Sequence, residues 1–188
     1  MEHKTAVIGM SFKYPDISSK KQFTDYLRNG KFVPTDGWVE RGALMNIPEY
    51  NKVMEGDFPL IDGIEYFDNK FFGIIKKEAV ELTPEMKMTL SFSVQAIYDA
   101  GYSIEQMRGT DCGLVIASSS QSCDYLSVLN KRSSVAALSA REATAGEKLS
   151  YYLDLRGPVY GIDSTCSSSL LGVSQACSIL ENHQADMM

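Results

Sequence analysis

Short apolar runs alternate with helical patterns along this chain, and this alternation constrains the fold more than any other feature. The runs lie at Thr5–Gly9, Cys112–Ala117 and Val159–Ile162, and Ala185–Met188 has the pattern of an opening strand. Helical patterns lie between them. Strands that alternate with helices are typical of an α/β protein with a mainly parallel sheet. We therefore expect layered helices around a mainly parallel, mixed sheet.

The clearest helix start is Thr83, whose hydroxyl can cap a helix that has Pro84 in its first turn. Apolar residues follow at helical spacing, and Gly101 marks the end. Further helices are predicted from a cap at Ser18 or Ser19 to Gly30, at Asp124–Asn130 and at Arg141–Leu153. The last predicted helix follows Cys166 and carries on one face Leu170, Val173, Cys177 and Leu180.

Composition and charge exclude several classes of function. The chain has 188 residues, of which 44% are hydrophobic and 22% charged, as in a globular domain. No apolar run approaches the about 20 residues that a membrane helix needs, and the N-terminus lacks the pattern of a secretory signal. The formal net charge is −6, and the basic residues are scattered, which argues against a nucleic-acid surface. We therefore expect a cytoplasmic protein with neither nucleic-acid nor membrane partners.

The whole chain, 1–188, is predicted to form one domain that is interrupted by a long loop excursion. Residues 32–59 hold three prolines, three glycines and the only tryptophan. A stretch of this length and composition has little regular structure and is typical of an ordered surface loop.

Four cysteines occur, at Cys112, Cys123, Cys166 and Cys177, and none has the C-x-x-C spacing of a zinc site. We therefore expect no bound metal. Disulfides are rare in the cytosol, so the useful question is which thiol is reactive. Cys112, Cys123 and Cys177 are expected to be buried packing residues.

Cys166 differs from the other cysteines because it lies between a predicted strand and a predicted helix start. The first amide groups of a helix have no intrahelical partner, and the helix dipole adds partial positive charge there. Thiols in such positions have a lowered pKa and are stronger nucleophiles at neutral pH. The same amides can stabilise an oxyanion. The alternative interpretation is that Cys166 only packs, as most cysteines near a helix start do.

Asp163-Ser-Thr-Cys-Ser-Ser-Ser-Leu170 resembles the nucleophile motif of polyketide ketosynthases, Asp-Thr-Ala-Cys-Ser-Ser-Ser-Leu. Four more stretches resemble signatures of the same family, in the same order along the chain. They are Ala6–Met10 with Lys13–Pro15, Phe67–Ile74, Asp99–Gly101 and Leu155–Pro158. The chain thus resembles the N-terminal part of a polyketide-synthase-type β-ketoacyl synthase over nearly its whole length.

The resemblance implies the thiolase fold, of which this chain would form the N-terminal half, incomplete at its C-terminus. It also implies that Cys166 takes an acyl chain from the phosphopantetheine of an acyl carrier protein. Decarboxylative Claisen condensation with a malonyl-type extender would follow. The Cys166 amide would be an oxyanion donor, and Ser167 and Ser168 would contact the substrate. The family further implies a homodimer, and no cofactor is expected to be bound by the chain itself.

The chain lacks two motifs of the family pattern. The two downstream histidine motifs that stabilise the enolate are absent, and the only histidines are His3 and His183. We expect His183 to be solvated. The chain alone is therefore predicted to be inactive in condensation and to need the C-terminal half of the domain as a partner. Smaller departures occur at Ser164 and Thr165 and within residues 138–148, near the dimer interface of the family.

Two alternatives to a condensing enzyme remain open at the level of sequence. A truncated, inactive ketosynthase-like module could bind a carrier protein or serve a structural role without chemistry. A different acyl-transfer enzyme on the same fold, such as a thiolase, is disfavoured by the three serines after Cys166 and by the Phe-Phe-Gly-Ile sequence that ends at Ile74.

Overall fold

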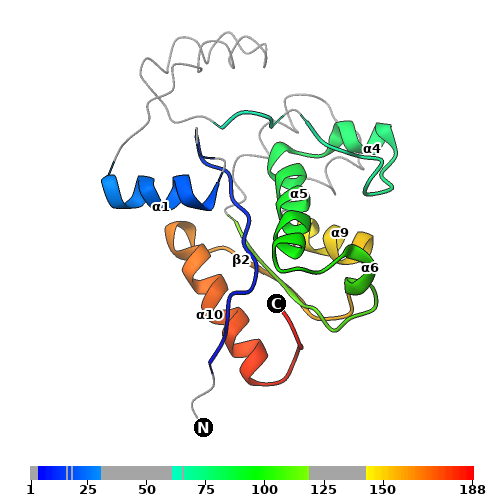
Figure 1. Ribbon diagram of the computed structural model, residues 1–188. Helices are drawn as coiled ribbons and strands as arrows, with labels where there is room; N and C mark the ends of the chain where they lie inside the picture. The colour runs from blue at the N-terminus through cyan, green and yellow to red at the C-terminus, as the bar shows by residue number, and fades with distance from the viewer. Residues whose placement is uncertain (1–3, 16, 18, 31–60, 65, 119–142) are drawn as a thin grey trace. The chain divides into compact units, whose positions relative to one another are not determined.

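A computed structural model describes residues 4–15, 17, 19–30, 61–64, 66–118 and 143–188 (Figure 1). The predicted loop excursion at 32–59 and the predicted helix at Asp124–Asn130 lie outside these residues. The chain divides into two compact units. One combines Met1–Ser11 with Glu65–Met188, and the other is Phe12–Ile64.

In the smaller unit, helix α1 spans Lys20–Asn29. The Ser19 hydroxyl accepts a hydrogen bond from the Gln22 amide at 3.2 Å, so Ser19 is the cap. Gly30 ends the helix with a φ of 60°, a left-handed conformation that costs glycine little. Phe23 on this helix stacks against Phe12 and Tyr14, with ring centroids 4.8 and 5.1 Å apart. Both predicted helix boundaries are confirmed.

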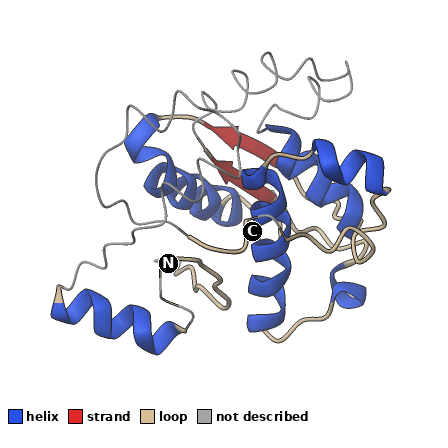
Figure 2. Cartoon of the chain, turned by 90° about the horizontal axis from the view of Figure 1, so that it is seen from above, coloured by secondary structure: helices blue, strands red, loops and turns tan. Residues whose placement is uncertain are grey.

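The sheet of the larger unit contains two described strands, which Figure 2 shows side by side. Strand β1 (Leu114–Ala117) and strand β2 (Val159–Ile162) are parallel, with Leu114 opposite Val159. A parallel bridge also joins Cys112 to Met187, and the Gly113 amide donates to the Met187 carbonyl at 2.8 Å. The predicted parallel sheet is therefore confirmed, and the expected strand opening near the C-terminus is seen as this one bridge.

The helices of the larger unit surround the sheet and supply its core. Their bounds are α4 Lys76–Glu81, α5 Pro84–Asp99, α6 Ile104–Met107, α9 Ala143–Leu153 and α10 Ser168–Glu181, with a 3₁₀ turn, η1, at Thr165–Ser167. The Thr83 hydroxyl caps α5, as predicted, by accepting the Met86 amide at 3.3 Å. Helices α5 and α9 bury Leu90, Leu149 and Leu153 in one hydrophobic cluster.

Helices α9 and α10 cover opposite faces of the sheet (Figure 1). Successive side chains of a strand point to opposite faces. Gly146 of α9 lies against Ile116 and Val159, whereas Gly172 of α10 lies against the alternate β1 residues Val115 and Ala117. Both helices thus approach the sheet at a glycine, where the missing side chain permits close contact.

The predicted strand at Thr5–Gly9 is wrong for this structure. The segment has no regular hydrogen-bonded structure, and Val7 is 77% exposed. Among the described residues no strand pairs with it; instead the adjoining Met10 amide donates to Asp99 Oδ2 at 2.9 Å. An apolar run gains strand structure only when a neighbour satisfies its backbone groups, and sequence alone does not reveal that neighbour.

Candidate active site

The structure places Cys166 in the short turn between β2 and α10. Strand β2 ends at Ile162, η1 contains the cysteine, and α10 begins at Ser168. The thiol is free and exposed. The predicted strand–turn–helix setting of Cys166 is therefore observed, with a 3₁₀ turn in front of the α-helix.

The backbone just before Cys166 has an unusual conformation. Thr165 has a φ of 49°, in the left-handed region that β-branched residues rarely adopt. The Asp163 side chain supports it, because Oδ1 accepts the Thr165 amide at 3.1 Å. An aspartate that bonds an amide two residues on is a known turn-forming pattern. Residues in sparsely populated conformations persist only where their surroundings hold them, and they often cluster at functional sites.

Serine hydroxyls tie this turn together. Ser167 Oγ lies 2.7 Å from Ser164 Oγ and donates to the Ser164 carbonyl at 2.9 Å. Ser168 Oγ accepts the Ser164 amide at 2.8 Å and donates to the Thr165 carbonyl at 2.8 Å. Ser168 is buried, whereas Ser167 is exposed. Substrate contact by either serine stays a prediction, but both hold the turn.

The start of α10 offers polar groups beside the thiol. Within the described part of the chain no side chain caps this helix, and its first turn contains no acidic residue. The first amides of a helix carry partial positive charge. A negative charge on a substrate oxygen near Cys166 would be stabilised there.

Helix α10 approaches the sheet at Gly172, which lies against Val115 and Ala117. Its buried residues are Ser168, Gly172 and Ile179. Of the predicted apolar face, Leu170 is 77% exposed and Val173 is 58% exposed, whereas Cys177 and Leu180 are half-buried. The thiol therefore lies at one end of a helix that presents apolar side chains outward.

The other described cysteines have different surroundings. Cys112 is buried, and burial, reinforced by the negative charge of Asp111, raises the pKa of its thiol to about 11. A thiol with such a pKa is almost entirely protonated at neutral pH and is a poor nucleophile. The prediction that Cys112 is a packing residue is confirmed. Cys177 is half-buried on α10, and Cys123 lies outside the described residues.

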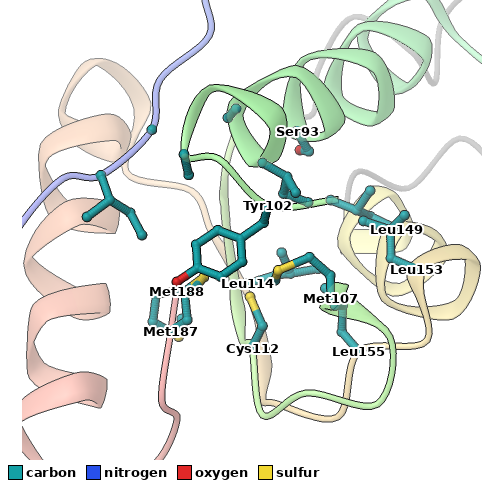
Figure 3. A pocket seen from close by; sticks show the side chains of 15 residues that line it. Ser93, Tyr102, Met107, Cys112, Leu114, Leu149, Leu153, Leu155, Met187 and Met188 are labelled. Carbon is teal, nitrogen blue, oxygen red and sulfur yellow. The ribbon is translucent and has the colours of Figure 1, made fainter. Parts of the chain in front are cut away.

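An apolar pocket of about 210 Å³ opens between α5, the sheet and the two terminal segments of the larger unit (Figure 3). Ile8 contributes from the N-terminal segment, Tyr102 from the turn after α5, and Met187 and Met188 from the C-terminus. Cys112 also lines the pocket, but Cys166 does not. This apolar pocket is thus separate from the candidate nucleophile, and Cys112, the thiol that lines it, is protonated at neutral pH.

Lys148, one of the residues that departs from the family pattern, forms an ion pair. Its Nζ lies 2.6 Å from Glu78 Oε1, and the Tyr152 hydroxyl donates to the same oxygen at 3.2 Å. The hydrogen bond from Lys148 holds the pKa of Glu78 below its usual value, while burial together with the Glu78 charge raises the pKa of Tyr152 to about 12. This cluster joins α9 to α4, so the lysine has a structural role here. Residues 138–142 lie outside the described region.

His183 is not a partner of Cys166. It is exposed in the turn after α10, at the opposite end of that helix from the thiol. A helix rises about 1.5 Å per residue, so the 14 residues of α10 separate the two by roughly 20 Å. His3 lies outside the described residues.

Among the described residues, no three His, Cys, Asp or Glu side chains are grouped so that they could hold a metal ion. In the same part of the chain, every helix is too short or too polar to cross a bilayer.

Comparison with known proteins identifies the class of this chain. Residues 2–188 match the family model described as "Beta-ketoacyl synthase, N-terminal domain". The chain therefore belongs to the β-ketoacyl synthase family, and the predicted family is confirmed.

Similar proteins are polyketide synthases and their ketosynthase domains. The chain is 34% identical to polyketide synthase PksN and 32% identical to PksL, both of Bacillus subtilis, over 97% and 99% of its length. It superposes on the ketosynthase from module 6 of the B. subtilis bacillaene synthase with a TM-score of 0.72 and 30% identity over 96% of the chain. For ketosynthase twelve of the bacillaene synthase of Bacillus amyloliquefaciens the TM-score is 0.75, with 27% identity over 96% of the chain.

These relatives are much longer than this chain. It spans 3–4% of the two curated synthases and 29–31% of the two solved ketosynthase chains. The likeness establishes a ketosynthase fold of the thiolase type for this region.

Sequence reasoning identified Cys166 but missed two features of its turn. The left-handed conformation of Thr165 had a signal in Asp163, since aspartate two residues before an amide favours such a turn. The burial of Ser168 between two exposed serines had no signal, because three identical residues in a row do not show which one faces the sheet.

Proposed function

We propose that Cys166 is the acyl-accepting nucleophile of a ketosynthase. The supporting observation is the exposed thiol that follows β2 and immediately precedes α10, in a chain that belongs to the β-ketoacyl synthase family. Its substrate is an acyl thioester on the phosphopantetheine arm of an acyl carrier protein.

In the first step the Cys166 thiolate attacks the thioester carbonyl of the acyl carrier protein. The carbon–sulfur bond to the carrier breaks, the carrier thiol takes up a proton, and an acyl–Cys166 thioester forms. The negative oxygen of the tetrahedral intermediate is stabilised by the Cys166 amide and by the partial charge at the start of α10. Thr165, held in its left-handed conformation, fixes the direction in which the chain enters the helix.

The second step is decarboxylative condensation. A malonyl-type extender on a carrier protein loses carbon dioxide, and the resulting carbanion attacks the acyl–Cys166 carbonyl. A new carbon–carbon bond forms, the Cys166 sulfur leaves, and the β-ketoacyl product stays on the extender's carrier. We propose that this chain by itself stops after the first step, because neither histidine motif is in its sequence.

We further propose that the rest of a ketosynthase domain covers α10. The side chains of Leu170, Leu171 and Val173 are all exposed near the start of α10, and exposed apolar side chains that lie together are typical of a contact surface. The greater length of the solved ketosynthase chains supports this partner. We also propose that the complete domain forms the homodimer that the family implies.

The second candidate function is a binding module without chemistry. The exposed apolar side chains near the start of α10 and the family departures near Lys148 favour it. The module would bind a carrier protein or a partner domain and would leave Cys166 unmodified.

Incubation with an acyl carrier protein loaded with a radiolabelled acyl group separates these two candidates. We expect one acyl group to be transferred to the chain, to map to Cys166, and to be lost in Cys166→Ala but retained in Cys177→Ala. Adding malonyl carrier protein is expected to yield no β-ketoacyl product. Absence of acylation in a folded chain, or transfer that persists in Cys166→Ala, would contradict the nucleophile assignment.

A further inference from the structure

Ser168 differs from its two serine neighbours in being buried. Only 5% of Ser168 is exposed, whereas Ser167 and Ser169 are exposed. A buried hydroxyl is costly unless it is hydrogen-bonded, so its partners indicate what the residue does.

The partners of Ser168 lie on the two residues before Cys166. Its Oγ accepts the Ser164 amide and donates to the Thr165 carbonyl, both at 2.8 Å. The Ser168 backbone amide donates to the same Thr165 carbonyl. One side chain thus bonds to the backbone of both residues, and Cys166 lies inside the loop that these bonds close.

These bonds act on the strained part of the turn. Thr165 has a left-handed φ of 49°, which is unfavourable for a β-branched residue. Without the Ser168 hydroxyl, the Ser164 amide and the Thr165 carbonyl would each lose a partner, and the turn would be free to relax. Relaxation would change where the thiol lies relative to the first amides of α10.

We propose that Ser168 is a positioning residue for Cys166. Its buried hydroxyl locks the turn at Ser164 and Thr165 and thereby holds the thiol at the start of α10. This role rests on the proposed nucleophilic function of Cys166, and it differs from the substrate contact predicted from the sequence. It acts through the backbone and requires no contact between Ser168 and substrate.

The test compares Ser168→Ala with the matched control Ser169→Ala. Both variants are treated with iodoacetamide at pH 7 and pH 9, and the rate at each cysteine is followed by peptide mass spectrometry. At pH 7 we expect Ser168→Ala to label Cys166 about fivefold more slowly, the factor that a typical hydrogen bond contributes to an equilibrium. The deficit is expected to shrink at pH 9, where more of any thiol is ionised. Ser169→Ala is expected to match the parent chain.

Two other cysteines report on the fold in the same experiment. Cys177 lies further along α10, and Cys112 is buried with a pKa of about 11, so both should keep their rates if the change is local to the turn. Faster labelling of Cys112 would show that Ser168→Ala opens the core. In that case the variant Ser168→Thr, which keeps the hydroxyl, tests the proposal. Recovery of the parent labelling rate at Cys166 supports it, and failure to recover that rate overturns it.

An unchanged Cys166 rate in a folded Ser168→Ala chain would also overturn the proposal. These readouts need no acyl carrier protein. A chain that shows the labelling deficit but accepts no acyl group would therefore contradict the proposed function and leave the positioning role of Ser168 intact.

Discussion

The two faces of the β1–β2 sheet are covered by helices that pack in different ways. On one face α9 and α5 enclose large apolar side chains, and Leu149 is 0% exposed. On the other face α10 meets the strands at Gly172 and buries Ile179, whereas Leu170, Leu171 and Val173 in its first half are exposed. The first face supplies stability to the larger unit, whereas the helix on the second face begins next to the candidate nucleophile and exposes apolar side chains.

Truncating one leucine on each side tests this contrast with the largest expected effect. Leu149→Ala removes a fully buried side chain and should lower the free energy of unfolding by about 2–5 kcal/mol. Leu170→Ala removes an exposed side chain and should change it by less than about 0.5 kcal/mol. Urea unfolding followed by circular dichroism measures both. A large loss for Leu170→Ala would show that the outward face of α10 is covered in solution.

The two glycines at the helix–sheet contacts sharpen the comparison. A Cβ at Gly146 would lie 2.8 Å from Ile116 Cγ1 and 2.9 Å from Val159 Cγ1, whereas one at Gly172 would lie 3.2 Å from Ala117 Cβ. Gly146→Ala should therefore cost about 1–3 kcal/mol through overpacking against two β-branched side chains, and the roughly 1 kcal/mol that alanine gains over glycine within a helix offsets part of this cost. In Gly172→Ala the milder contact is offset by the roughly 1 kcal/mol that alanine gains over glycine within a helix. Equal losses in thermal unfolding would contradict the closer approach of α9.

The ion pair between α9 and α4 makes the smallest contribution. The hydrogen bond from Lys148 lowers the pKa of Glu78 in the folded chain. The pair therefore stabilises the fold fully at pH values above the pKa of Glu78 in the unfolded chain. This stabilisation is lost as the pH falls through the pKa of Glu78 in the folded chain. Because both side chains are partly exposed, Glu78→Gln should cost less than about 1 kcal/mol at pH 7. The difference from the parent chain should shrink as the pH is lowered below the folded-state pKa of Glu78. A difference that does not shrink would assign the effect to packing instead.

Local signals in the sequence predicted much of this structure. Thr83 with Pro84, Ser19 and Gly30 mark helix boundaries through bonds or conformations that involve only their neighbours, and the structure confirms them. The junction at Cys166 could be predicted for the same reason, since a strand, a turn and a helix follow one another directly.

Features that depend on distant parts of the chain could not be predicted. The Thr5–Gly9 segment needed a partner strand, which sequence does not reveal. The sequence shows the apolar pattern of α10 but does not show whether the sheet or a partner covers it. That depends on how closely the helix can approach the sheet at Gly172. Ser168 is buried on the same face of the helix as Gly172 and Ile179, which follow it at helical spacing.

The central claim is that the turn before α10 makes Cys166 the reactive thiol of this chain. Its most direct test is the initial rate of iodoacetamide labelling at pH 7, resolved by residue on the parent chain. Cys166 is predicted to react first, ahead of half-buried Cys177, with Cys112 slowest because it is buried and its pKa is about 11. Labelling of Cys166 at or below the rate of Cys177 would contradict the account.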